Sequence, residues 1–139
     1  MRSGVAGCWE SGRRVHICRM QPWPIELEHA FANVGNEIYM SMIGPSDFNI
    51  IGSLNDWDVM DRLTEIAVPT LLVAGRYDEC RPDHMKDMHE RIPHSEFVLF
   101  EDSAHMPFFE EPDIFFRALR DFLVRSEAHA LKPSGPGSQ

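Results

Sequence analysis

Residues 68–75 read VPTLLVAG, an apolar run that a proline opens and a glycine closes. Such a run is typical of a strand buried on both faces, as in a parallel sheet with helices on either side. A second run, EFVLF, occupies residues 96–100. Helical patterns follow both runs: Pro82 opens a helix predicted to end near Arg91, and a final helix is predicted from about Pro112 to Arg125. Strands that alternate with helices predict an α/β protein with a parallel sheet.

The rest of the chain is predicted to be irregular at its ends and helical between the start and the first strand. Residues 1–20 carry no clear period and are expected to be irregular. Residues 21–58 are expected to be largely helical, because Pro22 and Pro24 fit a first helical turn and Asn36 can cap a second helix. Residues 59–126 form the predicted α/β segment, which begins with a short helix. Residues 127–139 end in a Pro-, Gly- and Ser-rich stretch and are predicted to be disordered.

Composition argues against several classes of function. The formal net charge of −9 disfavours nucleic acid or an anionic membrane as the main partner. The first twenty residues hold no long apolar run, so neither a signal peptide nor a membrane span is predicted there. Three cysteines without metal-type spacing favour free thiols in a reducing compartment, which predicts a cytoplasmic protein. His84 and His89 are five residues apart and share a helix face poorly, so no metal site is predicted. No cofactor is predicted either.

Two chemically capable side chains follow the two predicted strands. Asp78 comes just after the first strand and His105 just after the second. The carboxyl ends of neighbouring parallel strands lie at one rim of a sheet, where ligands collect. A carboxylate there can accept a hydrogen bond from one imidazole nitrogen, which leaves the other nitrogen to take a proton from a nucleophile. Each residue also has an ordinary structural explanation, since Asp78 could cap a turn and His105 could be a solvated loop residue.

Short motifs around these two residues resemble a known family. The sequences GRYDE at 75–79, SAHMP at 103–107 and EEP at 110–112 closely resemble the last two catalytic loops of α/β-hydrolases. The upstream sequences GPSDF at 44–48 and DWDV at 56–59 are similar to the prolyl aminopeptidase (proline iminopeptidase) branch. The resemblance implies an α/β fold that corresponds to the C-terminal part of an α/β-hydrolase. That part comprises the last two parallel strands with flanking helices, preceded by helices of the cap.

The resemblance also implies roles for individual residues. Asp78 matches the acid of a Ser-His-Asp triad and His105 matches its base. Glu79 matches a carboxylate that binds the free amino terminus of a peptide substrate. Asp47 stands where the family usually has a glutamate with the same anchoring role, and its side chain is one methylene shorter. The alternatives are a solvated loop charge for Glu79 and a loop cap for Asp47.

The sequence contains no nucleophile motif of this family. The family's Gly-x-Ser-x-Gly elbow is absent, because Phe48 stands where a motif centred on Ser46 needs its second glycine. Ser53 and Ser103 have no glycine two residues before or after them. No Gly-rich oxyanion loop is evident either. We therefore expect a fragment, a truncated gene product or one half of a split protein, inactive alone, that either pairs with a missing N-terminal half or self-associates. The alternatives are another α/β-hydrolase (an esterase, or a haloalkane- or epoxide-type hydrolase) and a non-catalytic interaction domain derived from one.

Overall fold

The structure is a computed structural model that describes residues 14–46 and 49–130. A helical turn at residues 14–16 precedes the longer elements. These are, in chain order, α2 (Ile25–Ala32), α3 (Asn36–Met42), the 3₁₀ helix η1 (Met60–Glu65), β1 (Thr70–Gly75), α4 (Pro82–Arg91), β2 (Ser95–Phe100), α5 (Pro107–Glu110) and α6 (Pro112–Ala130). Within the described ranges, no helix has the length and apolar character needed to cross a membrane.

The predicted parallel sheet is confirmed. β1 and β2 run parallel and in register from the pair Thr70 and Ser95 to the pair Gly75 and Phe100. β1 begins at Thr70 rather than at Val68, because Pro69 has no N–H to donate to the ladder. Both strands therefore end at the same rim, and the loops that follow them start side by side.

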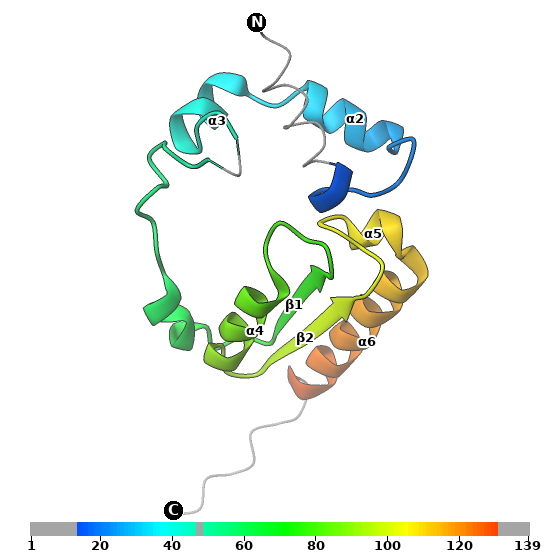
Figure 1. Cartoon of the computed structure of the whole chain (residues 1–139). Coiled ribbons are helices and arrows are strands. Elements are labelled where there is room, and N and C mark those ends of the chain that lie inside the picture. Colours follow the sequence, from blue (N-terminus) through cyan, green and yellow to red (C-terminus); the bar gives the residue numbers. More distant parts are fainter. Residues whose placement is uncertain (1–13, 47–48, 131–139) are drawn as a thin grey trace, which may run out of the picture.

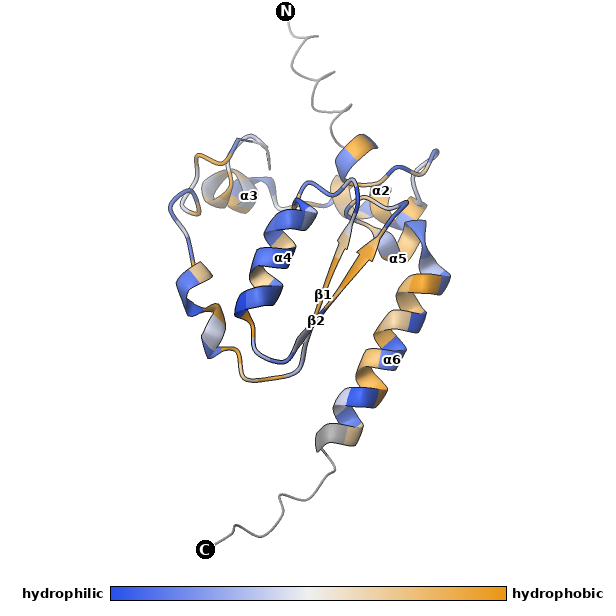
Figure 2. Cartoon of the chain, turned by 60° about the horizontal axis from the view of Figure 1, so that its bottom comes forward, coloured by the Kyte–Doolittle hydropathy of each residue, from blue (hydrophilic) through white to orange (hydrophobic). Residues whose placement is uncertain are grey.

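Helices cover the two strands on opposite sides, with α4 on one side and α6 on the other (Figures 1 and 2). The side of α4 holds the main core cluster, in which Leu63 of η1, Leu72 of β1 and Ile92 are buried together. The side of α6 is aromatic, and the rings of Phe100 and Phe115 lie 5.7 Å apart. Burial of these side chains fixes each helix against the sheet.

The strands are less buried than predicted. In β1 only Leu72, Ala74 and Gly75 are buried, and in β2 only Phe100 is. Among the described residues the sheet has two strands, so each strand keeps one edge without a neighbour. The apolar pattern matches a strand enclosed on both faces, whereas the helices present here enclose it only in part.

Three details of the sequence prediction are corrected. α6 continues to Ala130. The predicted helix end near Arg125 is therefore wrong, and so is the predicted disorder of residues 127–130. The helix continues because no helix breaker occurs before Pro133. Asn36 is not a cap: Gly35 holds the cap position, and no side-chain cap bond forms. Residues 14–16 of the predicted irregular start are helical.

Helices α2 and α3 lie beyond the carboxyl ends of the strands (Figure 1).

Candidate active site

Two loops leave the carboxyl ends of the strands and contact each other. The acid loop, residues 76–81, follows β1, and the histidine loop, residues 101–106, follows β2. The Tyr77 N–H donates to the Ser103 carbonyl at 3.0 Å, and the Arg76 N–H donates to the Phe100 carbonyl at 2.8 Å. These backbone bonds extend the pairing of the strands into the loops and set the spacing of the side chains that follow.

Asp78 and His105 are brought together by this arrangement. The Nδ1 atom of His105 lies 2.9 Å from Oδ1 of Asp78, where the carboxylate accepts and the imidazole donates. The same Oδ1 also accepts the Cys80 N–H at 2.8 Å, which fixes the carboxylate from a second direction. Asp78 is buried, whereas the His105 side chain is 45 % exposed. Donation from Nδ1–H makes Nε2 the nitrogen of a neutral His105 that can accept a proton.

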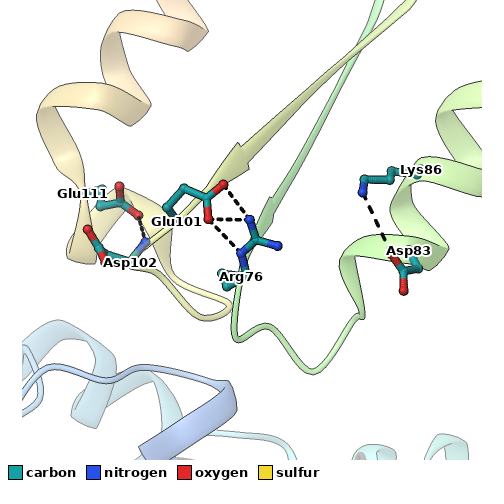
Figure 3. A network of polar contacts seen from close by, with 6 residues as sticks. All are labelled: Arg76, Asp83, Lys86, Glu101, Asp102 and Glu111. Atoms are coloured by element: carbon teal, nitrogen blue, oxygen red, sulfur yellow. Dashed lines mark hydrogen bonds and ion pairs between the residues drawn. The ribbon is translucent and has the colours of Figure 1, made fainter.

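An ion pair joins the two loops at their bases. The guanidinium of Arg76 binds both carboxylate oxygens of Glu101, with two contacts of 2.7 Å and one of 2.5 Å. Figure 3 shows the two side chains facing each other from the ends of β1 and β2. Both are exposed, so solvent screens their attraction, and their fixed geometry matters more than their charge.

The remaining predicted site residues are Glu79 and Asp47. Glu79 follows Asp78, is partly buried and has a buried Oε2 atom. It borders an open hollow of about 560 Å³ whose other lining residues are Cys80, Arg81, Asp83, His84 and Asp87. The hollow is rich in carboxylates, which suits a cationic group. Asp47 lies outside the described residues.

The thiol of Cys80 lies near the carboxylates of Asp78 and Glu79. Burial raises the pKa of the Cys80 thiol, and the negative charges of Asp78 and Glu79 raise it further. A raised pKa keeps this thiol protonated near neutrality, which makes it a poor nucleophile there. In the part of the chain that the structure describes, no cluster of three or more His, Cys, Asp or Glu side chains could hold a metal ion.

A segment far away in sequence also touches the site and was not recognised from sequence. The His105 N–H donates to the carbonyls of His16 and Ile17, at 3.2 and 3.1 Å. The guanidinium of Arg19 lies 3.6 Å from the centre of the Tyr77 ring. Residues 16–19 belong to a stretch without clear periodicity, about 90 positions before His105, so no local sequence pattern could reveal the contact.

Comparison with known proteins identifies the family. The family model described as "alpha/beta hydrolase fold" matches residues 14–112, more than half of the chain. This chain belongs to the alpha/beta hydrolase fold family. Its two parallel strands with helices on either side agree with part of such a fold, as the sequence motifs implied.

Within the alpha/beta hydrolase family, the chain is similar to proline iminopeptidases. It is 37% identical over 109 residues to the proline iminopeptidase of Chitinophaga pinensis, which is 77% of this chain and 36% of that one. It is 37% identical over 109 residues to that of Saccharolobus solfataricus, covering 78% and 35%. The crystal structure of the Mycobacterium smegmatis proline iminopeptidase superposes with a TM-score of 0.84 at 29% identity, over 93% of this chain and 44% of that one.

The chain spans a little more than a third of the length of these curated relatives. The printed sequence holds no Gly-x-Ser-x-Gly motif.

Proposed function

We propose that this chain supplies the acid, Asp78, and the base, His105, of a serine peptidase of the proline iminopeptidase type. The carrying observation is the 2.9 Å hydrogen bond between His105 Nδ1 and Asp78 Oδ1, at the rim where the two strands end. In such a pair the carboxylate fixes the tautomer of the imidazole and stabilises the imidazolium that forms when Nε2 takes a proton from a serine.

The nucleophile, in this proposal, comes from a polypeptide segment other than these 139 residues. The proposal rests on the missing Gly-x-Ser-x-Gly motif in the printed sequence. Without a serine and an oxyanion hole, an acid and a base alone provide little catalysis. The purified chain should therefore release no chromophore from a proline arylamide, and it should not differ from its Asp78→Ala variant.

A chimera tests the roles of Asp78 and His105 directly. In it, residues 14–130 of this chain replace the matching segment of the Chitinophaga pinensis proline iminopeptidase, which keeps its own N-terminal part. The proposal expects the chimera to hydrolyse proline p-nitroanilide and the His105→Ala chimera to lose this activity. A folded chimera whose turnover survives His105→Ala would overturn the assignment of the base.

The proposed substrate is a peptide with a free amino terminus, such as one that begins with proline. Glu79 supports this choice, since it is partly buried beside Asp78 at a hollow lined by further carboxylates. An α-ammonium group is held well by carboxylates in a partly dry pocket. Residues 21–58, which include α2 and α3, would cover the carboxyl ends of the strands as the remains of a cap. In this proposal Asp47 is a second carboxylate that binds the ammonium group.

A substitution of Glu79 distinguishes the proposed peptidase activity from the esterase alternative. In the chimera, Glu79→Gln should raise the KM for proline p-nitroanilide and leave hydrolysis of p-nitrophenyl acetate nearly unchanged, because the ester has no ammonium group. Glu90→Gln is the matched control, since Glu90 is an exposed carboxylate of α4. Equal losses on both substrates would favour the esterase or another α/β-hydrolase.

A further inference from the structure

Residues 16–19 cross both loops of the candidate site. The Nδ1–H of His16 donates to the Tyr77 carbonyl in the acid loop at 2.8 Å. The His105 N–H in the histidine loop donates to the carbonyls of His16 and Ile17. Ile17 is buried, with 3 % of its surface exposed. This segment therefore touches the backbone of both loops that carry the proposed acid and base.

Glu110 fastens this segment to the histidine loop. Its Oε1 atom accepts the Arg19 N–H at 2.7 Å, and its Oε2 atom accepts the Ala104 N–H at 2.8 Å. Ala104 is fully buried and directly precedes His105. Each oxygen of the carboxylate thus serves a different segment, and bonds from N–H groups to a carboxylate are about twice as strong as those to a neutral acceptor.

Glu111 offers a natural comparison. It also binds the histidine loop, but through one oxygen: Oε2 accepts the Asp102 N–H at 3.1 Å and the Ser103 hydroxyl at 2.5 Å. Figure 3 shows the Glu111 carboxylate beside Asp102. Glutamine has one acceptor oxygen and one NH₂ donor group. A glutamine at 111 can therefore keep both contacts, whereas a glutamine at 110 must turn its NH₂ toward one of two N–H groups.

We infer that Glu110 is a positioning residue that holds residues 16–19 against the histidine loop and thereby keeps the His105 ring directed at Asp78. The inference rests on the proposed function, since His105 is its base, but the contacts that carry it are independent of any substrate. The tautomer of a histidine is set by the hydrogen bond that its other nitrogen makes. If the backbone at Ala104 and His105 becomes more mobile, the hydrogen bond from His105 to Asp78 should weaken. The Nδ1–H tautomer should then no longer dominate.

The test is nuclear magnetic resonance on the full chain, without any activity measurement. Ring ¹⁵N shifts report the tautomer of His105, and Asp78→Asn assigns the signal that depends on the carboxylate. In Glu110→Gln, the Nδ1–H tautomer should lose its dominance, and amide exchange at His105 should rise about tenfold, as expected for one lost hydrogen bond. In Glu111→Gln, both readouts should stay near those of the unmodified chain.

Amide exchange in β1 and β2 checks that the fold persists in each variant. If Glu110→Gln does not fold, Glu110→Asp replaces it, because a carboxylate that is one methylene shorter keeps the charge but cannot hold both the Arg19 and the Ala104 N–H groups. A smaller rise of exchange at His105 is then expected. The inference is overturned if the folded variant keeps both the tautomer and the exchange rate, or if Glu111→Gln changes them equally. An inactive chimera would count against the proposed function while leaving these readouts intact.

Discussion

A β-carbon on Gly75 would lie 2.0 Å from the carbonyl oxygen of Ala104, a distance that no real pair of such atoms adopts. It would also lie 2.3 Å from the carbonyl oxygen of Ser103. The obstacle is backbone, which cannot turn aside as a flexible side chain can. The closeness of the acid loop and the histidine loop therefore depends on glycine at the end of β1.

Gly75→Ala should accordingly separate the two loops and destabilise the protein. The cost should be about 3 kcal/mol in the free energy of unfolding, at the upper end for an overpacked position. Urea unfolding followed by circular dichroism measures it. Gly35→Ala is the matched control, since nothing lies within 4 Å of its β-carbon. At position 35, alanine is a poorer N-cap than glycine, but it also makes the unfolded chain stiffer. These two effects on the free energy of unfolding should cancel to within about 1 kcal/mol. Equal costs at the two positions would show that the close approach does not constrain the loops.

Asp78→Asn should remove the orienting carboxylate and keep the shape of the site. An asparagine can present its NH₂ group to Nδ1 and so stabilise the wrong imidazole tautomer. In the chimera described above, kcat for proline p-nitroanilide should fall by about 10⁴-fold, as for the equivalent change in a serine protease with a Ser-His-Asp triad. Asp61→Asn is the control, because the Asp61 side chain is fully exposed on η1, outside both loops and the hollow, and its ion pair with Arg91 is long, at 3.9 Å. A fall of less than tenfold in Asp78→Asn would contradict the proposed role of Asp78 as triad acid.

The sequence predicts the sheet well because the signals there are local. Two apolar runs, each closed by turn residues, identify β1 and β2, and Pro82 fixes the start of α4. The meeting of Asp78 and His105 follows from the shared direction of the two strands. The contacts of residues 16–19 could not be predicted, because they use backbone carbonyls such as that of Ile17. Every residue has a backbone carbonyl, so such a contact requires no particular side chain and leaves no pattern in the sequence.

The thiol of Cys80 should react slowly with alkylating reagents near neutral pH. Burial is the main cause that raises the pKa of the Cys80 thiol, followed by the charges of Asp78 and Glu79. The thiolate is the reactive form, so alkylation should be slower than for a free cysteine at pH 7–8 and should increase only above the pKa of about 8.5 of an unperturbed thiol. Iodoacetamide labelling across a pH series, resolved by peptide mass spectrometry, measures this rate.

Glu79→Gln supplies the control for that experiment. Removing one negative charge should lower the pKa of the Cys80 thiol and speed its labelling, while burial keeps the rate below that of a free cysteine. Fast labelling of the unmodified protein at neutral pH would contradict both the burial and the charge environment of this thiol.

The outer face of α6 should make the isolated chain self-associate. Phe116, Leu123 and Val124 are exposed by 50 %, 48 % and 60 %, although they are large and apolar. Exposed apolar surface of this kind favours association, and an open strand edge adds a second route. Light scattering should therefore give a mass above that of one chain, rising with concentration. Val124→Glu should lower it, whereas Arg117→Gln, which changes the net charge by the same amount on the same helix, should not. A monodisperse monomer at all concentrations would instead favour an independently stable interaction domain, because such a domain tolerates this surface without a second chain to cover it.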